Sequence, residues 1–160
     1  IKDIYEVLVS LDEYASGTVI GKIDDSGLQE LEKILDKMQQ ASRNNRIKEH
    51  LNANVDFHRC IWKYLPNHFL EKTLCFVQDQ LLRYTYARVT VFKEKDLLLR
   101  SFNEHEMILA AIRGKNRKEL KKLIKRNWCF LLDYMPLVST KNKISIKNGG
   151  GKRSEKDKII

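Results

Sequence analysis

Residues 51–62 read LNANVDFHRCIW, and the fold of the chain follows most directly from this stretch. With the 3.6-residue period of an α-helix, one face of it comprises Leu51, Val55, His58 and Trp62. Asn54 lies one turn before His58 and borders the same face. The stretch therefore predicts a helix that turns an imidazole and a carboxamide toward its apolar side. Because a buried polar group without a partner costs about 1–3 kcal/mol, we expect other helices to supply partners for both.

The same helical period recurs from the start of the chain to about residue 137. It predicts helices at about residues 3–20, 27–41, 47–64, 68–92, 94–113 and 117–135. Ser26 with Gln29, and Asn116 with Glu119, resemble the capping boxes that begin helices. Gly114 suits the left-handed position that commonly follows a helix. No strand pattern is present, so the sequence predicts an all-α fold, an antiparallel bundle of about six helices.

Composition predicts one helical domain, residues 1–138, followed by a basic, glycine-containing tail, residues 139–160. Of the formal net charge of +9, the tail carries +5, so the remaining +4 on the domain argues against a basic nucleic-acid-binding surface there. No apolar run approaches the roughly 20 residues that span a bilayer, which excludes an integral membrane protein. The three cysteines form no C-x-x-C pair, so we expect reduced, structural thiols and a cytoplasmic protein.

Polar side chains fall on rows that are otherwise apolar in four of the predicted helices. They are Asn54, His58, Arg88, His105 and Asn127. Each alone has an ordinary explanation, since one neighbour can satisfy a core histidine, an arginine can reach the surface and an asparagine can bond a backbone group. A bundle, however, directs its inward faces to one interior, where ligand and metal sites are built from facing helices. Together these residues predict an interior ligand pocket that favours an anion, alone or with a metal.

Four short motifs carry a resemblance to a known family. They are DIYEV at 3–7, N-x-x-x-H ending in FH at 57–58, PNHFL at 66–70 and EHEMILAAI at 104–112. In order and spacing they resemble the C-terminal effector-binding domain (FCD type) of the FadR branch of GntR-type transcriptional regulators, over about residues 1–137. The resemblance implies an all-α domain that senses a small carboxylate and dimerises. It also implies that DNA is bound only through an N-terminal winged helix-turn-helix, which is absent from this chain.

The resemblance also implies candidate metal ligands, because many family members hold a divalent metal with one Asp and three His. The Asp position is Asn54 here, two histidine positions are His58 and His105, and the last falls on Asn127. Zinc prefers imidazole, thiolate or carboxylate ligands, so two carboxamides in this set predict weak metal binding at most. We therefore expect the pocket to hold an anionic effector directly, through Arg88 and the two imidazoles.

The first helix matches the family only in part, since the usual Arg and Glu there read Leu8 and Asp12. Dimerisation is implied mainly by the resemblance. A second apolar edge on the fourth predicted helix adds modest support, and it consists of Phe69, Phe76, Leu82 and Tyr86. That edge could equally pack against the first helix.

Two other classes of function compete with a sensing domain. A metal-assisted hydrolase or di-iron enzyme needs inward carboxylates, and the predicted inward rows lack them. A structural interaction module without a ligand would give His58, Arg88, His105 and Asn127 each its own protein partner and no shared cavity. The sequence does not identify the effector.

Overall fold

A computed structural model describes the backbone of residues 2–88 and 95–128, and the side chains of residues 2–84 and 96–128. Its helices are α1 (Lys2–Val19), α2 (Asp25–Arg43), α3 (Ile47–Trp62), α4 (His68–Arg88) and α5 (Lys95–Arg113), followed by a helical segment at residues 117–128. No strand occurs within these described ranges. The all-α prediction is confirmed. The predicted tail, residues 139–160, lies outside the described residues.

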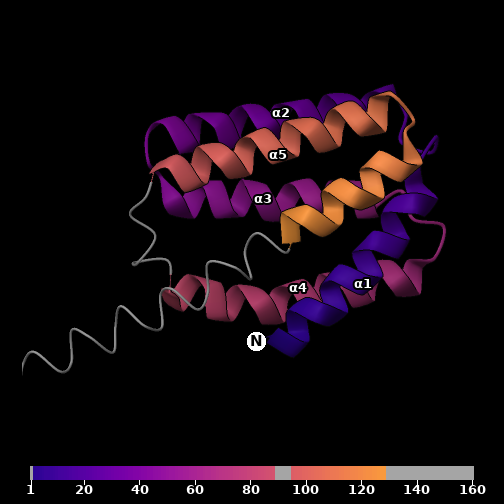
Figure 1. The fold of residues 1–160 in the computed structure, drawn as a ribbon, viewed down its shortest axis with the longest axis horizontal. Helices are drawn as coiled ribbons and strands as arrows, with labels where there is room; N and C mark the ends of the chain where they lie inside the picture. The colour runs from indigo at the N-terminus through magenta and orange to yellow at the C-terminus, as the bar shows by residue number, and fades with distance from the viewer. Residues whose placement is uncertain (1, 89–94, 129–160) are drawn as a thin grey trace, which may run out of the picture.

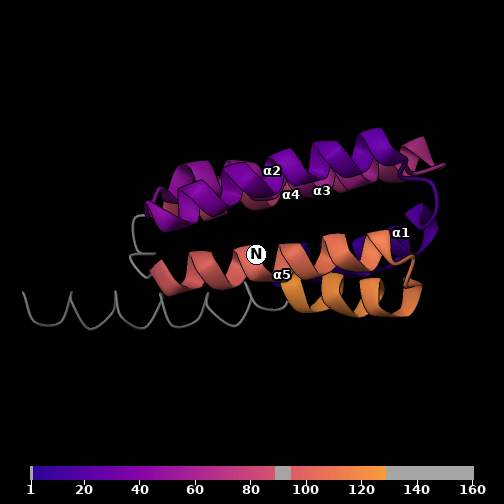
Figure 2. The same cartoon turned by 90° about the horizontal axis from the view of Figure 1, so that it is seen from above.

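The helices form two layers with the core between them. Figure 2 shows α2, α3 and α4 in one layer and α1, α5 and residues 117–128 in the other. In Figure 1, α5 and residues 117–128 run in opposite directions and are joined by a short turn. Both layers contribute fully buried side chains to the core, including Leu8, Leu31, Met38, Phe57, Leu74, Ile108 and Ile124. The apolar rows predicted from the sequence thus meet at one interior.

Two helix ends differ from the sequence predictions. The helix α2 begins at Asp25, because the Asp24 carboxylate accepts a hydrogen bond from the Gly27 amide at 2.8 Å, so Ser26 is not its capping residue. After α5, the left-handed residue is Lys115 (φ 51°) rather than Gly114. Asp24 thus caps α2 in place of Ser26, and Lys115 takes the left-handed conformation in place of Gly114.

Two other predicted helix starts agree with the structure. The Asn116 side chain accepts a hydrogen bond from the Glu119 amide at 3.1 Å, as the capping pattern predicts. Asn67 caps α4 by accepting from the amides of Phe69 and Leu70, each at 3.1 Å. The described part of α4 ends at Arg88, so its predicted continuation to residue 92 lies outside the described residues.

Candidate functional site

The predicted site residues with described side chains all lie in the interior. Asn54 is 9% exposed, Asn127 is 3% exposed, and His58 and His105 are completely buried. Arg88 belongs to α4, but its side chain lies outside the described residues. Helical periodicity therefore placed these four side chains correctly, on α3, on α5 and on the segment 117–128.

His58 is linked across the bundle through Asn127. The Nε2 atom of His58 lies 3.2 Å from Oδ1 of Asn127, and Nδ2 of Asn127 donates to Oε2 of Glu104 at 3.4 Å. Because a carboxylate only accepts, the carboxamide must turn its NH₂ group to Glu104 and its carbonyl oxygen to His58. His58 therefore donates through Nε2. One asparagine thus joins α3 to α5.

Asp12 of α1 is the central acceptor of this region, and the sequence pointed to it only as a partial match to the family in the first helix. Its Oδ1 accepts from the indole N–H of Trp62 and its Oδ2 from that of Trp128, both at 2.7 Å. Oδ2 also lies 3.3 Å from Nδ1 of His58, although the angle is too poor for a hydrogen bond. Two indole donors explain how a carboxylate only 1% exposed is tolerated in the core.

Glu104 is a second buried carboxylate, at 6% exposure. Its Oε1 lies 3.4 Å from Nε of Arg126, and its Oε2 accepts from Asn127. The sequence prediction that the inward rows lack carboxylates is therefore wrong for Asp12 and Glu104. Each is held by donors of its own, so neither is a free general base.

His105 presents an unused nitrogen to the interior. Its Nδ1 lies 2.7 Å from the Ser101 carbonyl oxygen, which only accepts, so Nδ1 carries the proton. Burial first, and then the neighbouring His58, lower the pKa of His105 well below its ordinary value, so the ring is neutral. Its Nε2 is therefore a bare lone pair, fully buried and without a hydrogen-bond partner among residues 2–84 and 96–128. The rings of His58 and His105 lie edge to face, with centroids 5.3 Å apart.

We call Asp12, His58, Glu104, His105 and Asn127 the open cluster, because His105 leaves a polar atom unused. Gln78 of α4 is a similar case elsewhere in the core, where Nε2 is buried without a partner in the described part of the chain while Oε1 accepts from Arg59 at 2.8 Å. Buried polar atoms without a hydrogen-bond partner are uncommon in folded proteins, so each one needs an explanation.

A third buried histidine, His50, shows the contrasting case. His50 Nδ1 lies 2.9 Å from Ser42 Oγ, and His50 Nε2 lies 3.0 Å from Ser101 Oγ. Ser42 donates its own hydrogen to the Met38 carbonyl at 2.8 Å, so it accepts from His50 Nδ1 and leaves Nε2 to accept from Ser101. Burial lowers the pKa of His50 to about 4. We call Ser42, His50 and Ser101 the closed network, since both ring nitrogens of the histidine have partners.

The residues present do not fit a tight metal site of the kind that the resemblance implies. The implied ligand set consists of two imidazoles and two carboxamides, and Oδ1 of Asn127 already lies 3.2 Å from Nε2 of His58. Across residues 2–84 and 96–128, no three His, Cys, Asp or Glu side chains are placed to share one metal ion. An amide oxygen is a weak ligand for zinc. The two carboxylates of the open cluster, Asp12 and Glu104, already accept hydrogen bonds from Trp62, Trp128 and Asn127.

A surface groove of about 210 Å³ lies between α2 and α5, away from the open cluster. Its lining includes Asp36, Phe102 and Glu106, together with the ion pair between Glu32 and Arg113. None of the open-cluster residues lines it. This groove is therefore not the interior pocket predicted from the sequence, and that pocket stays a prediction.

The described cysteines are free thiols. Cys60 is buried, and burial raises the pKa of its thiol to about 12, which makes it unreactive. Cys75 is half-buried, and burial likewise raises its pKa. Cys129 lies outside the described residues. The expectation of structural thiols agrees with both environments.

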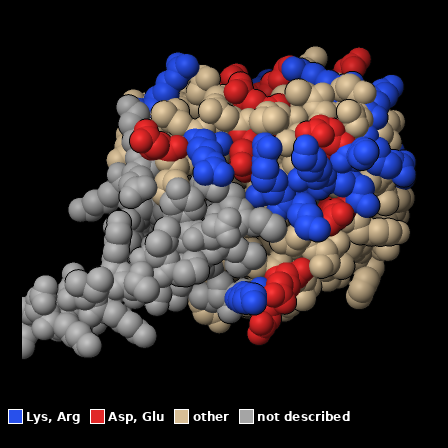
Figure 3. All heavy atoms as spheres, viewed as in Figure 1, with Lys and Arg blue, Asp and Glu red and all other residues tan. Residues whose placement is uncertain are grey.

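Basic side chains gather over residues 117–128, as Figure 3 shows on the face seen in Figure 1. Acidic partners neutralise part of this charge, because Lys122, Lys125 and Arg126 lie within ion-pair distance of Glu119, Glu13 and Glu104 respectively. In the described part of the chain, no helix is both long and apolar enough to cross a membrane.

Comparison with known proteins places this bundle in a family. A family model described as the FCD domain matches residues 3–128. An uncharacterised HTH-type transcriptional regulator, YdhC of Bacillus subtilis, is 26% identical over 123 residues, which are 76% of this chain and 54% of that protein.

Two solved structures have the same fold. Escherichia coli McbR/YncC superposes with a TM-score of 0.74 at 17% identity, over 88% of this chain and 65% of that one. Streptococcus agalactiae GntR superposes with a TM-score of 0.65 at 23% identity, over 81% of this chain and 56% of that one. The chain thus spans between half and two thirds of the length of these relatives.

Proposed function

The chain belongs to the FCD domain family, and from that premise we propose that it is the ligand-sensing and dimerisation domain of a cytoplasmic GntR-type transcriptional regulator. FCD domains are effector-binding regulatory domains rather than enzymes. The observation that carries the proposal is the unused lone pair of His105, which is fully buried in the interior of the bundle. A purely structural core would give this nitrogen a partner, as the closed network does for His50.

The chemistry of His105 specifies one part of the effector. Because Nδ1 is committed to the Ser101 carbonyl, Nε2 can only accept a hydrogen bond. The bound molecule must therefore present a donor, such as a hydroxyl group, to this nitrogen. A purely acceptor group, such as an ionised carboxylate oxygen, would face the lone pair unfavourably.

The charges in the open cluster specify where an anionic group would bind. Asp12 and Glu104 already place two carboxylates in the interior, and Glu104 is compensated by Arg126. A further anion needs positive charge of its own, and Arg88 of α4 is our candidate for it. We propose a small hydroxy-carboxylate, with its carboxylate held by Arg88, its hydroxyl on His105, and Asn54 and Asn127 beside it.

A divalent metal is a weaker candidate for the same residues. His58 and His105 would be its imidazole ligands, with Asn54 and Asn127 in place of the usual Asp and His. Because the two carboxamides are weak ligands and the carboxylates of Asp12 and Glu104 already accept other hydrogen bonds, we expect such a site to lose zinc on purification or dialysis.

Effector binding would be transmitted through the hydrogen bonds of Asp12. This carboxylate ties α1 to Trp62 of α3 and to Trp128, so displacement of His58 or Trp128 would shift α1. In the complete protein we propose that α1 leads to the DNA-binding domain, which would report that shift.

A thermal-shift screen of small carboxylates tests the proposal, with each acid offered with and without an α-hydroxyl group and with and without zinc. A ligand at 100 times its Kd stabilises the folded state by about 2.7 kcal/mol, which corresponds to a rise in Tm of several degrees. The expected result is stabilisation by a hydroxy-carboxylate that needs no zinc.

Two variants locate the site. Arg88→Met and His105→Leu should each abolish the ligand-dependent rise in Tm, whereas Ser42→Ala in the closed network should preserve it. If zinc stays bound in stoichiometric amount after dialysis, or if only zinc stabilises the protein, direct binding of an anion is wrong.

A further inference from the structure

The positive charge of this chain is concentrated after α5. Residues 1–113 contain 16 Lys and Arg against 17 Asp and Glu, whereas residues 114–128 contain seven against one. Those seven are Lys115, Arg117, Lys118, Lys121, Lys122, Lys125 and Arg126. The net charge of the whole domain, which argues against a nucleic-acid-binding surface, hides this concentration. Figure 3 shows Lys and Arg side chains gathered there on one face of the molecule.

Four of these residues form a row along the outer side of the helical segment 117–128. They are Lys118, Lys121, Lys122 and Lys125, and we call them the lysine row. Steps of three and four residues place them on one face of the helix, over a length of about 10 Å. The opposite face holds the segment to the core through buried side chains, including Leu120 and Ile124. Three of the lysines are exposed, and the half-buried Lys121 extends its stem over Gly17 of α1.

Acidic side chains neutralise little of the lysine row. Lys118 and Lys121 have no carboxylate within ion-pair distance among residues 2–84 and 96–128. The other two lysines lie 3.8 Å from Glu119 and 3.7 Å from Glu13, and their side chains are 70% and 60% exposed. Exposed ion pairs of this kind are weak, so a lysine can exchange such a partner for another anion.

The lysine row opposes the stability of its own helix. Like charges three or four residues apart on a helix repel each other, and four pairs within the row have that spacing. Arg117 and Lys118 also lie in the first turn, after the Asn116 cap, where the helix dipole disfavours cations. Places where a sequence departs from local helix preference are often functional. An anionic partner would remove both kinds of repulsion.

The surroundings of the lysine row favour a partner that is recognised by charge alone. No large apolar side chain is exposed on residues 117–128, so this face has nothing to insert into a membrane surface or to stack on unpaired bases. Protein interfaces are depleted in lysine and enriched in aromatic residues, which also disfavours a protein partner. The backbone of duplex DNA offers a closely spaced line of phosphates, to which lysine binds as a point charge.

We propose that the lysine row binds the phosphate backbone of duplex DNA, whatever its base sequence. The inference rests on the proposed function, because a regulator that holds DNA through a separate domain keeps this domain at a high local concentration of phosphate groups. Contacts to phosphates position a protein on DNA but carry no sequence information. The lysine row would therefore add affinity, while the DNA-binding domain reads the sequence.

Fluorescence anisotropy of this chain with a labelled duplex, between about 50 and 200 mM salt, tests the inference. Lys118→Gln, Lys122→Gln and Lys125→Gln together should reduce the slope of log K against log salt by about 2.7, because each lost phosphate contact contributes about 0.9. Over this range the variant should lose about 40-fold less affinity than the unaltered chain. Duplexes of unrelated sequence should give the same result.

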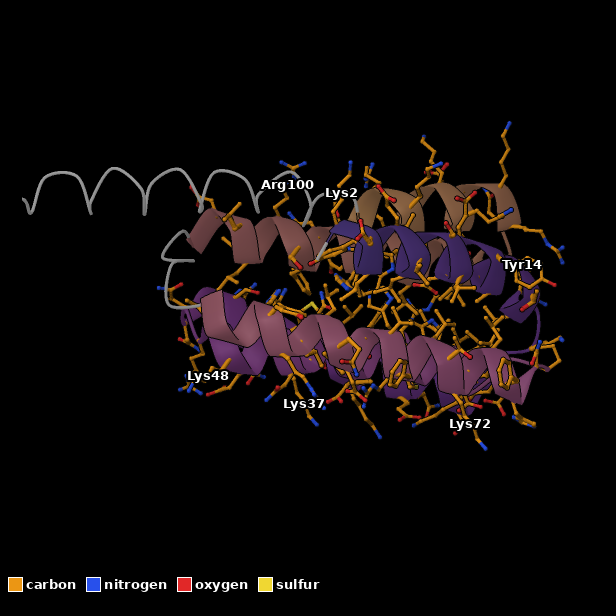
Figure 4. All side chains as sticks on the ribbon, turned by 90° about the horizontal axis from the view of Figure 1, so that it is seen from below. Lys2, Tyr14, Lys37, Lys48, Lys72 and Arg100 are labelled. Atoms are coloured by element: carbon orange, nitrogen blue, oxygen red, sulfur yellow. The ribbon has the colours of Figure 1, made fainter. Side chains whose placement is uncertain are left out.

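Two further variants control for net charge and for folding. Lys33→Gln, Lys37→Gln and Lys48→Gln remove the same charge from exposed positions on α2 and α3, and this variant should keep the slope of the unaltered chain. Figure 4 shows Lys37 and Lys48 on the side of the molecule away from residues 117–128. Arginine in place of the three lysines of the row keeps the charge and should keep the binding. Every variant retains residues 139–160, so the basic tail contributes equally to all of them.

Four outcomes would overturn the inference. The first is an unchanged slope when the row is changed to glutamine. The second is an equal loss in the α2 and α3 variant, which would mean that only net charge matters. The third is a loss of binding in the arginine variant, which would mean that the charge of the row is not the cause. The fourth is unchanged duplex binding together with lost binding to phosphatidylserine vesicles, which would identify a lipid surface as the partner.

The DNA contact and the sensing function fail separately. If a carboxylate stabilises the chain but duplex binding does not depend on the lysine row, sensing stands and the DNA contact is wrong. If duplex binding depends on the lysine row but no carboxylate stabilises the chain, the DNA contact stands and the proposed effector is wrong.

Discussion

Two buried histidines, His50 and His58, illustrate the difference between a structural polar network and a candidate binding site. In the closed network every ring nitrogen of His50 has a hydroxyl partner, so a ligand would have nothing to gain there. In the open cluster, His58 bonds Asn127 through Nε2, while Nδ1 of His58 and Nε2 of the adjacent His105 have no hydrogen-bond partner among the described residues. Ser101 belongs to both, since its hydroxyl bonds His50 and its carbonyl bonds His105. Both regions contain buried histidines. They differ in whether every buried ring nitrogen has a hydrogen-bond partner.

Removing Asp12 should break the open cluster with the largest effect. Asp12→Ala leaves the indole N–H groups of Trp62 and Trp128 buried without an acceptor. We expect a loss of about 3–5 kcal/mol in the free energy of unfolding, measured with urea. The chain has two tryptophans, so both indole N–H signals in an NMR spectrum should shift together.

Asp12→Asn is the control, because it retains one carbonyl oxygen and so one indole bond. It should cost less than Asp12→Ala. A loss below about 1 kcal/mol for Asp12→Ala would show that the two indoles find other acceptors and that Asp12 does not hold the cluster together.

Acid should weaken the closed network. The pKa of His50 is about 4 in the folded protein and about 6.5 in the unfolded chain, so the unfolded state binds more protons between these values. Stability is therefore complete above about pH 6.5 and is lost as the pH falls toward 4. One pKa unit corresponds to about 1.4 kcal/mol, so the full loss from His50 is on the order of 3 kcal/mol.

His105 acts in the same direction, because burial also lowers its pKa. Urea unfolding at pH 7, 6 and 5 measures the combined slope. His50→Gln removes one titrating group and should flatten the slope, although it lowers stability at pH 7. An unchanged slope in this variant would mean that His50 titrates normally in the folded state.

The sequence predicted which side chains face the interior better than it predicted what they bond. Helical period placed His58, His105 and Asn127 in the core, because an inward row needs only the spacing of residues along one helix. It missed Asp12, because Leu8 is followed at helical spacing by both Leu11 and Asp12, and a polarity pattern selects the leucine. Asp12 is the buried one, while Leu11 is half-buried.

A signal for Asp12 did exist in the composition. A buried tryptophan needs an acceptor for its N–H, and both tryptophans of this chain fall within helical segments. The acceptor comes from α1, far along the chain from Trp128, and helical period within one segment carries no information about such a contact. The pairing of His50 with Ser42 and Ser101 escaped prediction for the same reason.

Replacing His105 should change stability least while changing function most, which is the sharpest test of the comparison. His105→Leu removes an imidazole whose Nε2 has no partner, so no buried bond at that atom is lost. The Ser101 carbonyl loses the side-chain bond but keeps its helical amide partner. We therefore expect the free energy of unfolding to fall by no more than about 1 kcal/mol. His58→Leu should cost about 1–3 kcal/mol, because it leaves the buried Oδ1 of Asn127 without its donor. Both variants should lose the carboxylate-dependent rise in Tm.

If His105→Leu is instead as destabilising as His58→Leu and keeps the ligand response, His105 belongs with the structural histidines, and the distinction between open and closed networks does not identify the site.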